Sequence, residues 1–167
     1  MGNVFFNMYG VSDSGHGGTN LGGTMAGRGA RLNHLSHEQL ETLYGWIDSV
    51  PLSRPKRNIA RDFSDGVLCA EIVKHYMPRA VDLHNYPQTD RLPDKLANWR
   101  TLNTKIFRKR LHMQLNAGQI DALARADAGA IEPLLLRLRT KLQQVEQKGR
   151  ARTASEEALE AEGGAPA

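Results

Sequence analysis

The sequence of 167 residues has little of several features that would point to particular protein classes. Cys69 is its one cysteine, so an internal disulfide is excluded and a reducing compartment is favoured. The longest apolar run, 131–138, is interrupted by glutamate, proline and arginine and is far too short to span a membrane. The first residues lack the charged and apolar regions of a signal peptide. We therefore expect a soluble, cytoplasmic protein with no membrane partner.

Motifs for catalysis and for metal or cofactor binding are also missing. The six histidines are scattered, and one cysteine cannot build a thiolate zinc site. The sequence has no P-loop, no nucleophile elbow and no dinucleotide-binding glycine motif after a strand. Asp62 and Asp65 lie near an expected helix start, where a carboxylate usually caps the helix. These absences predict a non-enzymatic protein with no metal and no cofactor.

Helical patterns fill residues 36–147, without strand alternation or an internal repeat. Ser36 and Gln39 have the spacing of a capping box, and apolar residues at helical spacing follow until Pro51 ends the pattern. Ser64 is expected to cap a second helix. Further patterns predict helices at 65–76, at 94–110, after Asn116, and from about Asp127 onward. The expected fold class is all-α, with one helical domain.

The two ends of the sequence have a different composition. Residues 1–35 hold 9 of the 16 glycines and show no helical or alternating pattern, which is typical of a flexible arm. Residues 148–167 contain one short Glu/Ala stretch and no sustained heptads, so we expect a polar tail without a coiled coil. The sequence thus predicts three parts: an arm at 1–35, a domain at 36–147 and a tail at 148–167. We expect the arm and the tail to contact neighbouring proteins.

The positive charge is concentrated in one part of the chain. The formal net charge is +4, yet residues 54–110 hold 13 Lys/Arg and 6 Asp/Glu. Lys105, Arg108 and Lys109 have the spacing of one helix face, where they either complement the helix dipole or meet an acidic partner. A loop has no dipole to complement, so cations within 54–57 favour an acidic polymer as partner.

Several strings within this region are specific enough to suggest a family. They lie at 43–48, 51–58, 61–67, 84–86 and 96–103, and include Pro51-Leu52-Ser53-Arg54-Pro55-Lys56-Arg57-Asn58. Together they closely resemble the calponin-homology-like domain of the sperm flagellar protein 1 family, over about 36–147. The resemblance implies a calponin-homology fold, direct binding and bundling of microtubules, and a place in the ciliary or flagellar axoneme, chiefly at its central pair.

The matched residues divide into core and surface. The apolar members have core spacing and are expected to be buried: Trp46, Phe63, Leu68, Ile72 and Trp99. The basic members are expected to be exposed and to bind microtubules, together with the three cations that share one helix face. These residues are Arg54, Lys56, Arg57 and Arg61, and on the helix face Lys105, Arg108 and Lys109. Single charge reversals are predicted to abolish microtubule binding and to leave the melting temperature unchanged at four of these residues: Arg54, Lys56, Arg57 and Arg61.

Two other functions remain open at this point. A single calponin-homology domain is also compatible with binding to actin or with a scaffold role among axonemal proteins. Nucleic-acid binding is disfavoured, because stacking aromatic residues are expected among the cations and Phe107 is the one aromatic residue within 105–110. We therefore expect tubulin and other axonemal proteins as partners, and no nucleic acid.

Overall fold

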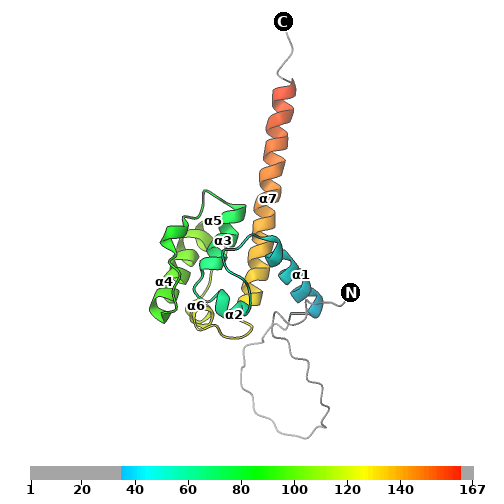
Figure 1. Cartoon of the computed structure of the whole chain (residues 1–167). Helices are drawn as coiled ribbons and strands as arrows, with labels where there is room; N and C mark the ends of the chain where they lie inside the picture. Colours follow the sequence, from blue (N-terminus) through cyan, green and yellow to red (C-terminus); the bar gives the residue numbers. More distant parts are fainter. Residues whose placement is uncertain (1–34, 163–167) are drawn as a thin grey trace, which may run out of the picture.

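A computed structural model describes residues 35–162, so the arm expected at 1–35 lies outside this range except for its last residue. The described chain contains helices and no strand, which confirms the all-α class. Figure 1 shows a bundle from which one long helix projects. The elements are α1 (His37–Ser49), α2 (Ile59–Asp62), α3 (Val67–Tyr76), η2 (Leu83–Asn85), α4 (Leu92–Leu102), the π-helical turn η3 (Asn103–Phe107), α5 (Arg108–Arg110), α6 (Ala117–Ala124) and α7 (Ile131–Glu162).

Two helices start as their sequences predict. The Ser36 hydroxyl accepts a hydrogen bond from the Gln39 backbone N–H, and the Gln39 side chain accepts one from the Ser36 N–H. The pair Asn116 and Gln119 makes the same reciprocal capping box before α6. Each box satisfies two backbone donors that would have no partner within the helix.

The second expected helix starts later than predicted, because its cap is a glycine. The N-cap of α3 is Gly66, with φ of 76°, in the left-handed region. Ser64, the expected cap, instead donates its hydroxyl to the Arg61 carbonyl. The prediction of a helix from Asp65 was therefore wrong at its N-terminus, and the one-turn helix α2 before it was missed.

The third expected helix is interrupted. Residues 92–110 form one helical run, but its middle, η3, is a π turn with hydrogen bonds five residues apart. The Arg108 N–H reaches the Asn103 carbonyl and the Leu111 N–H reaches that of Ile106, the latter at 3.2 Å. Such turns are rare and are often found at functional sites.

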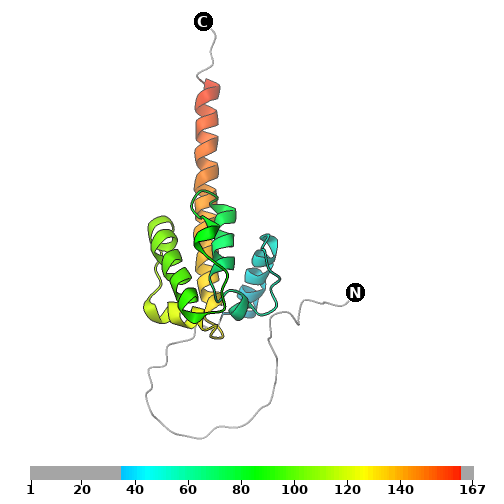
Figure 2. The ribbon, with the colours of Figure 1, turned by 60° about the vertical axis from the view of Figure 1, so that its left-hand side comes forward.

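The last helix is much longer than a compact domain requires. Its first half packs on the core, contacts α1 and α3, and buries Leu135, Leu138 and Leu142 completely. From Glu146 to Ala161 its side chains are exposed, and Figures 1 and 2 show this part projecting beyond the other helices. The segment 148–162, which belongs to the expected polar tail, is therefore helical.

The core contains the apolar residues that the family strings share. Phe63, Leu68, Ile72 and Trp99 are fully buried, and Trp46 is 9% exposed. The Trp99 indole donates to the Ser64 carbonyl at 2.8 Å, while the Trp46 indole donates to the Tyr76 hydroxyl. Each large side chain therefore buries its ring and still satisfies its polar atom.

Candidate functional site

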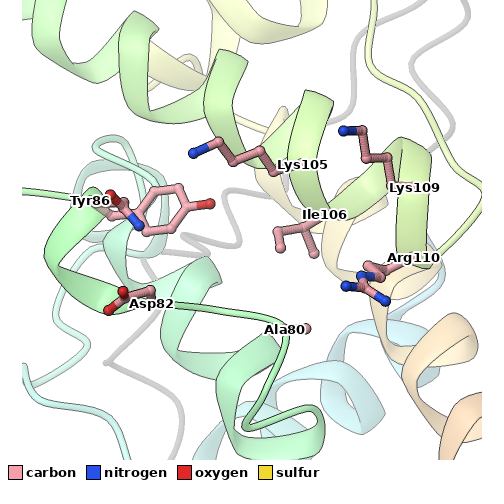
Figure 3. Close-up of a pocket in the computed structure, with 8 residues that line it drawn as sticks. Ala80, Asp82, Tyr86, Lys105, Ile106, Lys109 and Arg110 are labelled. Atoms are coloured by element: carbon pink, nitrogen blue, oxygen red, sulfur yellow. The ribbon is translucent and has the colours of Figure 1, made fainter.

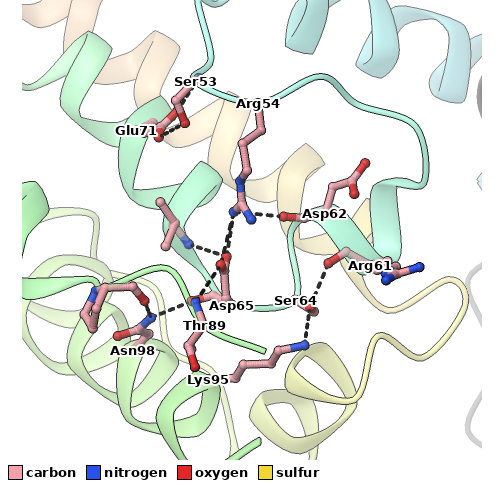
Figure 4. A network of polar contacts seen from close by, with 12 residues as sticks. Ser53, Arg54, Arg61, Asp62, Ser64, Asp65, Glu71, Thr89, Lys95 and Asn98 are labelled. Carbon is pink, nitrogen blue, oxygen red and sulfur yellow. Dashed lines mark hydrogen bonds and ion pairs between the residues drawn. The ribbon is translucent and has the colours of Figure 1, made fainter. Parts of the chain in front are cut away.

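The basic loop before α2 is fastened to the domain by its first arginine. Arg54 Nη2 lies 2.9 Å and 3.1 Å from the two carboxylate oxygens of Asp65 and also donates to the Asp62 carbonyl (Figure 4). The Arg54 side chain is 25% exposed and that of Asp65 is 3% exposed. A carboxylate so deeply buried needs a charged partner, so Arg54 is a structural residue.

Lys56 is also committed to an internal contact. Its ammonium lies 2.7 Å from Asp48 and donates to the Ile47 carbonyl at the C-terminal end of α1. The lysine side chain is 12% exposed. A cation at this end of a helix offsets the partial negative charge of the last carbonyls. The expectation that Arg54 and Lys56 present their charges to solvent was therefore wrong.

Asp65 is the centre of a polar network that joins the loop to α3 and α4. Besides Arg54 it accepts hydrogen bonds from the backbone N–H groups of Val67 and Thr89. The Asn98 amide donates to the Asp65 and Pro87 carbonyls, each at 2.9 Å (Figure 4). The residues of the basic motif thus hold three parts of the fold together.

The other two cations near α2 are free. Arg57 and Arg61 are exposed, and no side-chain hydrogen bond or ion pair joins them to another residue in the described range 35–162. Their backbone is nevertheless fixed, because the Asp62 carboxylate accepts from the Arg57 N–H and the Asn58 side chain accepts from the Arg61 N–H. Two exposed, unpaired charges therefore extend from a turn whose backbone is held by hydrogen bonds.

A second group of free cations lies where the helical run of η3 and α5 ends. Lys105, Arg108, Lys109 and Arg110 are all exposed, and none has an ion pair within the part of the chain that the structure describes. The π turn alters their arrangement: it brings Lys105, Lys109 and Arg110 to one pocket, whereas Arg108 does not line it. Arg110 was noted in the sequence as a cation but not as a candidate, since its position depends on this turn.

The pocket has a volume of about 460 Å³ and lies between these cations and the segment 80–86. Figure 3 shows Lys105, Lys109 and Arg110 on one wall and Asp82 with Tyr86 on the other. Ile106 lies between the two walls. Burial raises the pKa of the Tyr86 hydroxyl, so this group stays protonated and able to donate. Sequence reasoning missed this pocket, since 80–86 and 105–110 are far apart in the chain.

The two groups of free cations are not one compact patch. The start of α4 lies beside α2, because Lys95 donates to the Ser64 hydroxyl at 2.9 Å. Arg108 lies about 20 Å further along the same helical run, at 1.5 Å per residue. The structure therefore separates Arg57 and Arg61 from Lys105, Arg108 and Lys109, which favours a partner with an extended acidic surface.

Within residues 35–162 the metal-ligating side chains do not gather into one site. No group of three or more His, Cys, Asp or Glu side chains is close enough together to hold an ion. Asp62 binds backbone N–H groups and Asp65 binds Arg54, so both carboxylates have structural roles. None of the described helices combines the length and the apolar character needed to cross a bilayer.

Comparison with known proteins identifies relatives of this domain. A family model described as "CH-like domain in sperm protein" matches residues 43–140. Sperm flagellar protein 1 of Homo sapiens is 44% identical over 110 residues, which are 66% of this chain and 46% of the relative. The proteins of the same name from Mus musculus and Xenopus laevis are also 44% identical over 110 residues. The chain matches about half the length of these curated relatives.

Proposed function

The chain belongs to the family of CH-like domains in sperm proteins, and we propose that it is a cytoskeletal, non-enzymatic protein of the ciliary or flagellar axoneme that binds microtubules. Its relatives are named as flagellar proteins, which supports the location. Central-pair microtubules are the expected lattice, as the family resemblance implies.

One observation carries the proposal of an acidic filament as the partner. Two groups of exposed cations, one beside α2 and one in η3 and α5, have no acidic partner within residues 35–162: Arg57 and Arg61, and Lys105, Arg108, Lys109 and Arg110. Unpaired like charges repel one another, so a surface that keeps them gains most when it meets an acidic partner.

The proposed binding residues differ from those first expected. Arg57, Arg61, Lys105, Arg108 and Lys109 remain, because their charges are exposed and free. We exclude Arg54 and Lys56 from the proposed binding residues, because they form ion pairs with Asp65 and Asp48, respectively. Their contribution to binding is indirect: they fix the loop that presents Arg57.

Contacts between exposed charges at the edge of an interface are individually weak. Exposed ion pairs contribute about 0.2–1 kcal/mol each, so five of them give an affinity that depends strongly on salt. A specific complex also needs shape complementarity, or many copies bound along a repeating lattice. A filament supplies both the repeat and the extended acidic surface that the two separated groups require.

Co-sedimentation with three polymers tests the proposal. The full chain should pellet with microtubules, and should not pellet with actin filaments or duplex DNA at the same salt concentration. Pelleting with actin alone would instead favour the actin-binding function. Pelleting with none of the three would favour a scaffold role among axonemal proteins.

A pair of matched double variants tests the surface. R57E/R108E should weaken microtubule binding by about tenfold, since each contact is lost and replaced by repulsion. R137E/K148E makes the same charge change at exposed positions of α7 and should weaken it much less. Equal losses would mean that net charge, and not this surface, controls binding.

A further inference from the structure

The pocket between 80–86 and the η3–α5 turn has properties of a ligand site that the family match does not assign. It offers three cationic side chains, Lys105, Lys109 and Arg110, against one carboxylate, Asp82. Asp82 is already partnered, because its Oδ1 lies 2.7 Å from His84 Nδ1. The pocket therefore has an excess of positive charge facing a volume of about 460 Å³ that no described side chain fills.

The arrangement depends on the π turn. In a regular α-helix, residues three and four apart share a face, which would group Lys105 with Arg108 and Lys109. The turn η3, closed by hydrogen bonds five residues apart, instead brings Arg110 to the side of Lys105 and Lys109 and leaves Arg108 outside the lining. A rare backbone conformation thus gathers the three cations that face the pocket.

The chemistry of the walls favours a carboxylate-bearing peptide over a phosphate. Phosphate sites typically use backbone N–H groups at a helix N-terminus, whereas this pocket lies at a helix C-terminal end and offers cationic side chains instead. The helix carbonyls and Asp82 repel any anion, but Asp82 can also accept a hydrogen bond from a peptide N–H, a donor that a fully ionised phosphate lacks. The Asn85 amide and the Tyr86 hydroxyl, both lining residues, can bond to a peptide chain as well.

We propose that this pocket binds a glutamate- or aspartate-rich polypeptide segment of the partner, whose carboxylates contact Lys105, Lys109 and Arg110. The apolar lining residue Ile106 packs against the aliphatic part of such side chains. This inference deepens the proposed function, on which it rests for the choice of an acidic filament as partner.

Two lysines provide a matched pair of variants. K109Q removes a cation that lines the pocket, and K148Q makes the same change at an exposed position of α7, outside the pocket and the proposed binding set. The probe is a fluorescein-labelled peptide of ten glutamates, with affinity measured by fluorescence anisotropy on the full chain at low salt. K109Q should weaken binding about fivefold and K105Q/K109Q further, because each loses a charge-assisted contact. K148Q should change the affinity less than twofold.

Amide chemical shifts of the full chain locate the peptide independently. Changes confined to 80–86 and 105–110 support the proposal. Equal effects of K148Q and K109Q, or shift changes spread over all exposed cations, overturn it in favour of nonspecific charge. Tighter binding of a ten-nucleotide single-stranded DNA to the same residues also overturns it, in favour of a phosphate ligand.

The two proposals can fail separately. If the wild-type chain pellets with microtubules but the peptide does not bind in the pocket, the pocket proposal fails and the microtubule proposal stands. If the peptide binds in the pocket but the chain does not pellet, the microtubule proposal fails and the pocket serves another acidic partner.

Discussion

Arg54 illustrates why a basic residue in a loop cannot be assigned to binding from its sequence position. Its position in the sequence, near Lys56 and Arg57 and between two prolines, suggests one of several outward cations. In the structure its charge meets Asp65, a buried carboxylate 11 residues away. Burial of Asp65 depends on α3 and α4, so no local pattern predicts the pair.

Removing this partner should destabilise the fold. We expect R54Q to lower the free energy of unfolding by about 2–3 kcal/mol, less than for a fully buried pair because Arg54 is partly exposed. R57Q removes an equal charge from an exposed side chain three residues later. It should change the free energy of unfolding by less than about 0.5 kcal/mol. Urea denaturation of the two variants measures both free energies. Equal stability of R54Q and R57Q would contradict the structural role of Arg54.

Cys69 and Tyr44 make stability sensitive to high pH. Burial raises the pKa of the Cys69 thiol from 9.0 to about 12. Burial and Glu132 raise the pKa of Tyr44 from 10.0 to about 12. Each folded-state pKa is above the unfolded value, so the stabilisation is complete below the unfolded pKa and is lost as pH rises toward the folded one.

The free energy of unfolding should therefore fall by about 1–2 kcal/mol between pH 8 and pH 10, mostly through Cys69. Urea denaturation at the two pH values measures it. C69A is less stable at both, because it leaves a cavity, but its dependence on pH should be smaller. A C69A variant with the full pH dependence would show that the thiol does not cause it.

At the scale of elements, local signals predicted the ends of helices where side chains make the caps. Ser36 with Gln39 forms the box that its spacing indicates, and the helix expected after Asn116 starts there with a second box to Gln119. The start of α3 was missed because its cap is Gly66, whose role comes from its left-handed backbone conformation and from the lack of room for a Cβ. The π turn was missed because its residues have an ordinary helical pattern.

Gly66 gives a direct test of the α3 start. A Cβ there would lie 3.2 Å from Leu102 Cδ1, on a backbone with φ of 76°. G66A should destabilise the domain by about 1–3 kcal/mol, through left-handed strain and the close contact.

Gly45 is the matched control, since it lies inside α1 with nothing within 4 Å of an added Cβ. G45A should stabilise the domain by about 0.5–1 kcal/mol, because alanine is the better helix former. Thermal unfolding of both variants distinguishes the sites. A neutral or stabilising G66A would contradict the conformation described for this turn.

At the scale of the whole molecule, the sequence predicted one helical domain with a basic surface. The structure confirms the class and buries the expected core. The structure revises the predicted binding surface, because two of the expected binding cations form internal ion pairs and the others form two separated groups. This division follows from tertiary contacts between 54–65, α1 and α4, which no single segment reveals.

The most direct test of this account is the dissociation constant of the full chain for microtubules, measured by co-sedimentation across a salt series. Exposed, unpaired cations predict that binding is present at low salt and weakens steadily as salt screens the contacts. Binding that is absent at low salt, or that does not change with salt, would contradict the claim that these cations hold an acidic filament.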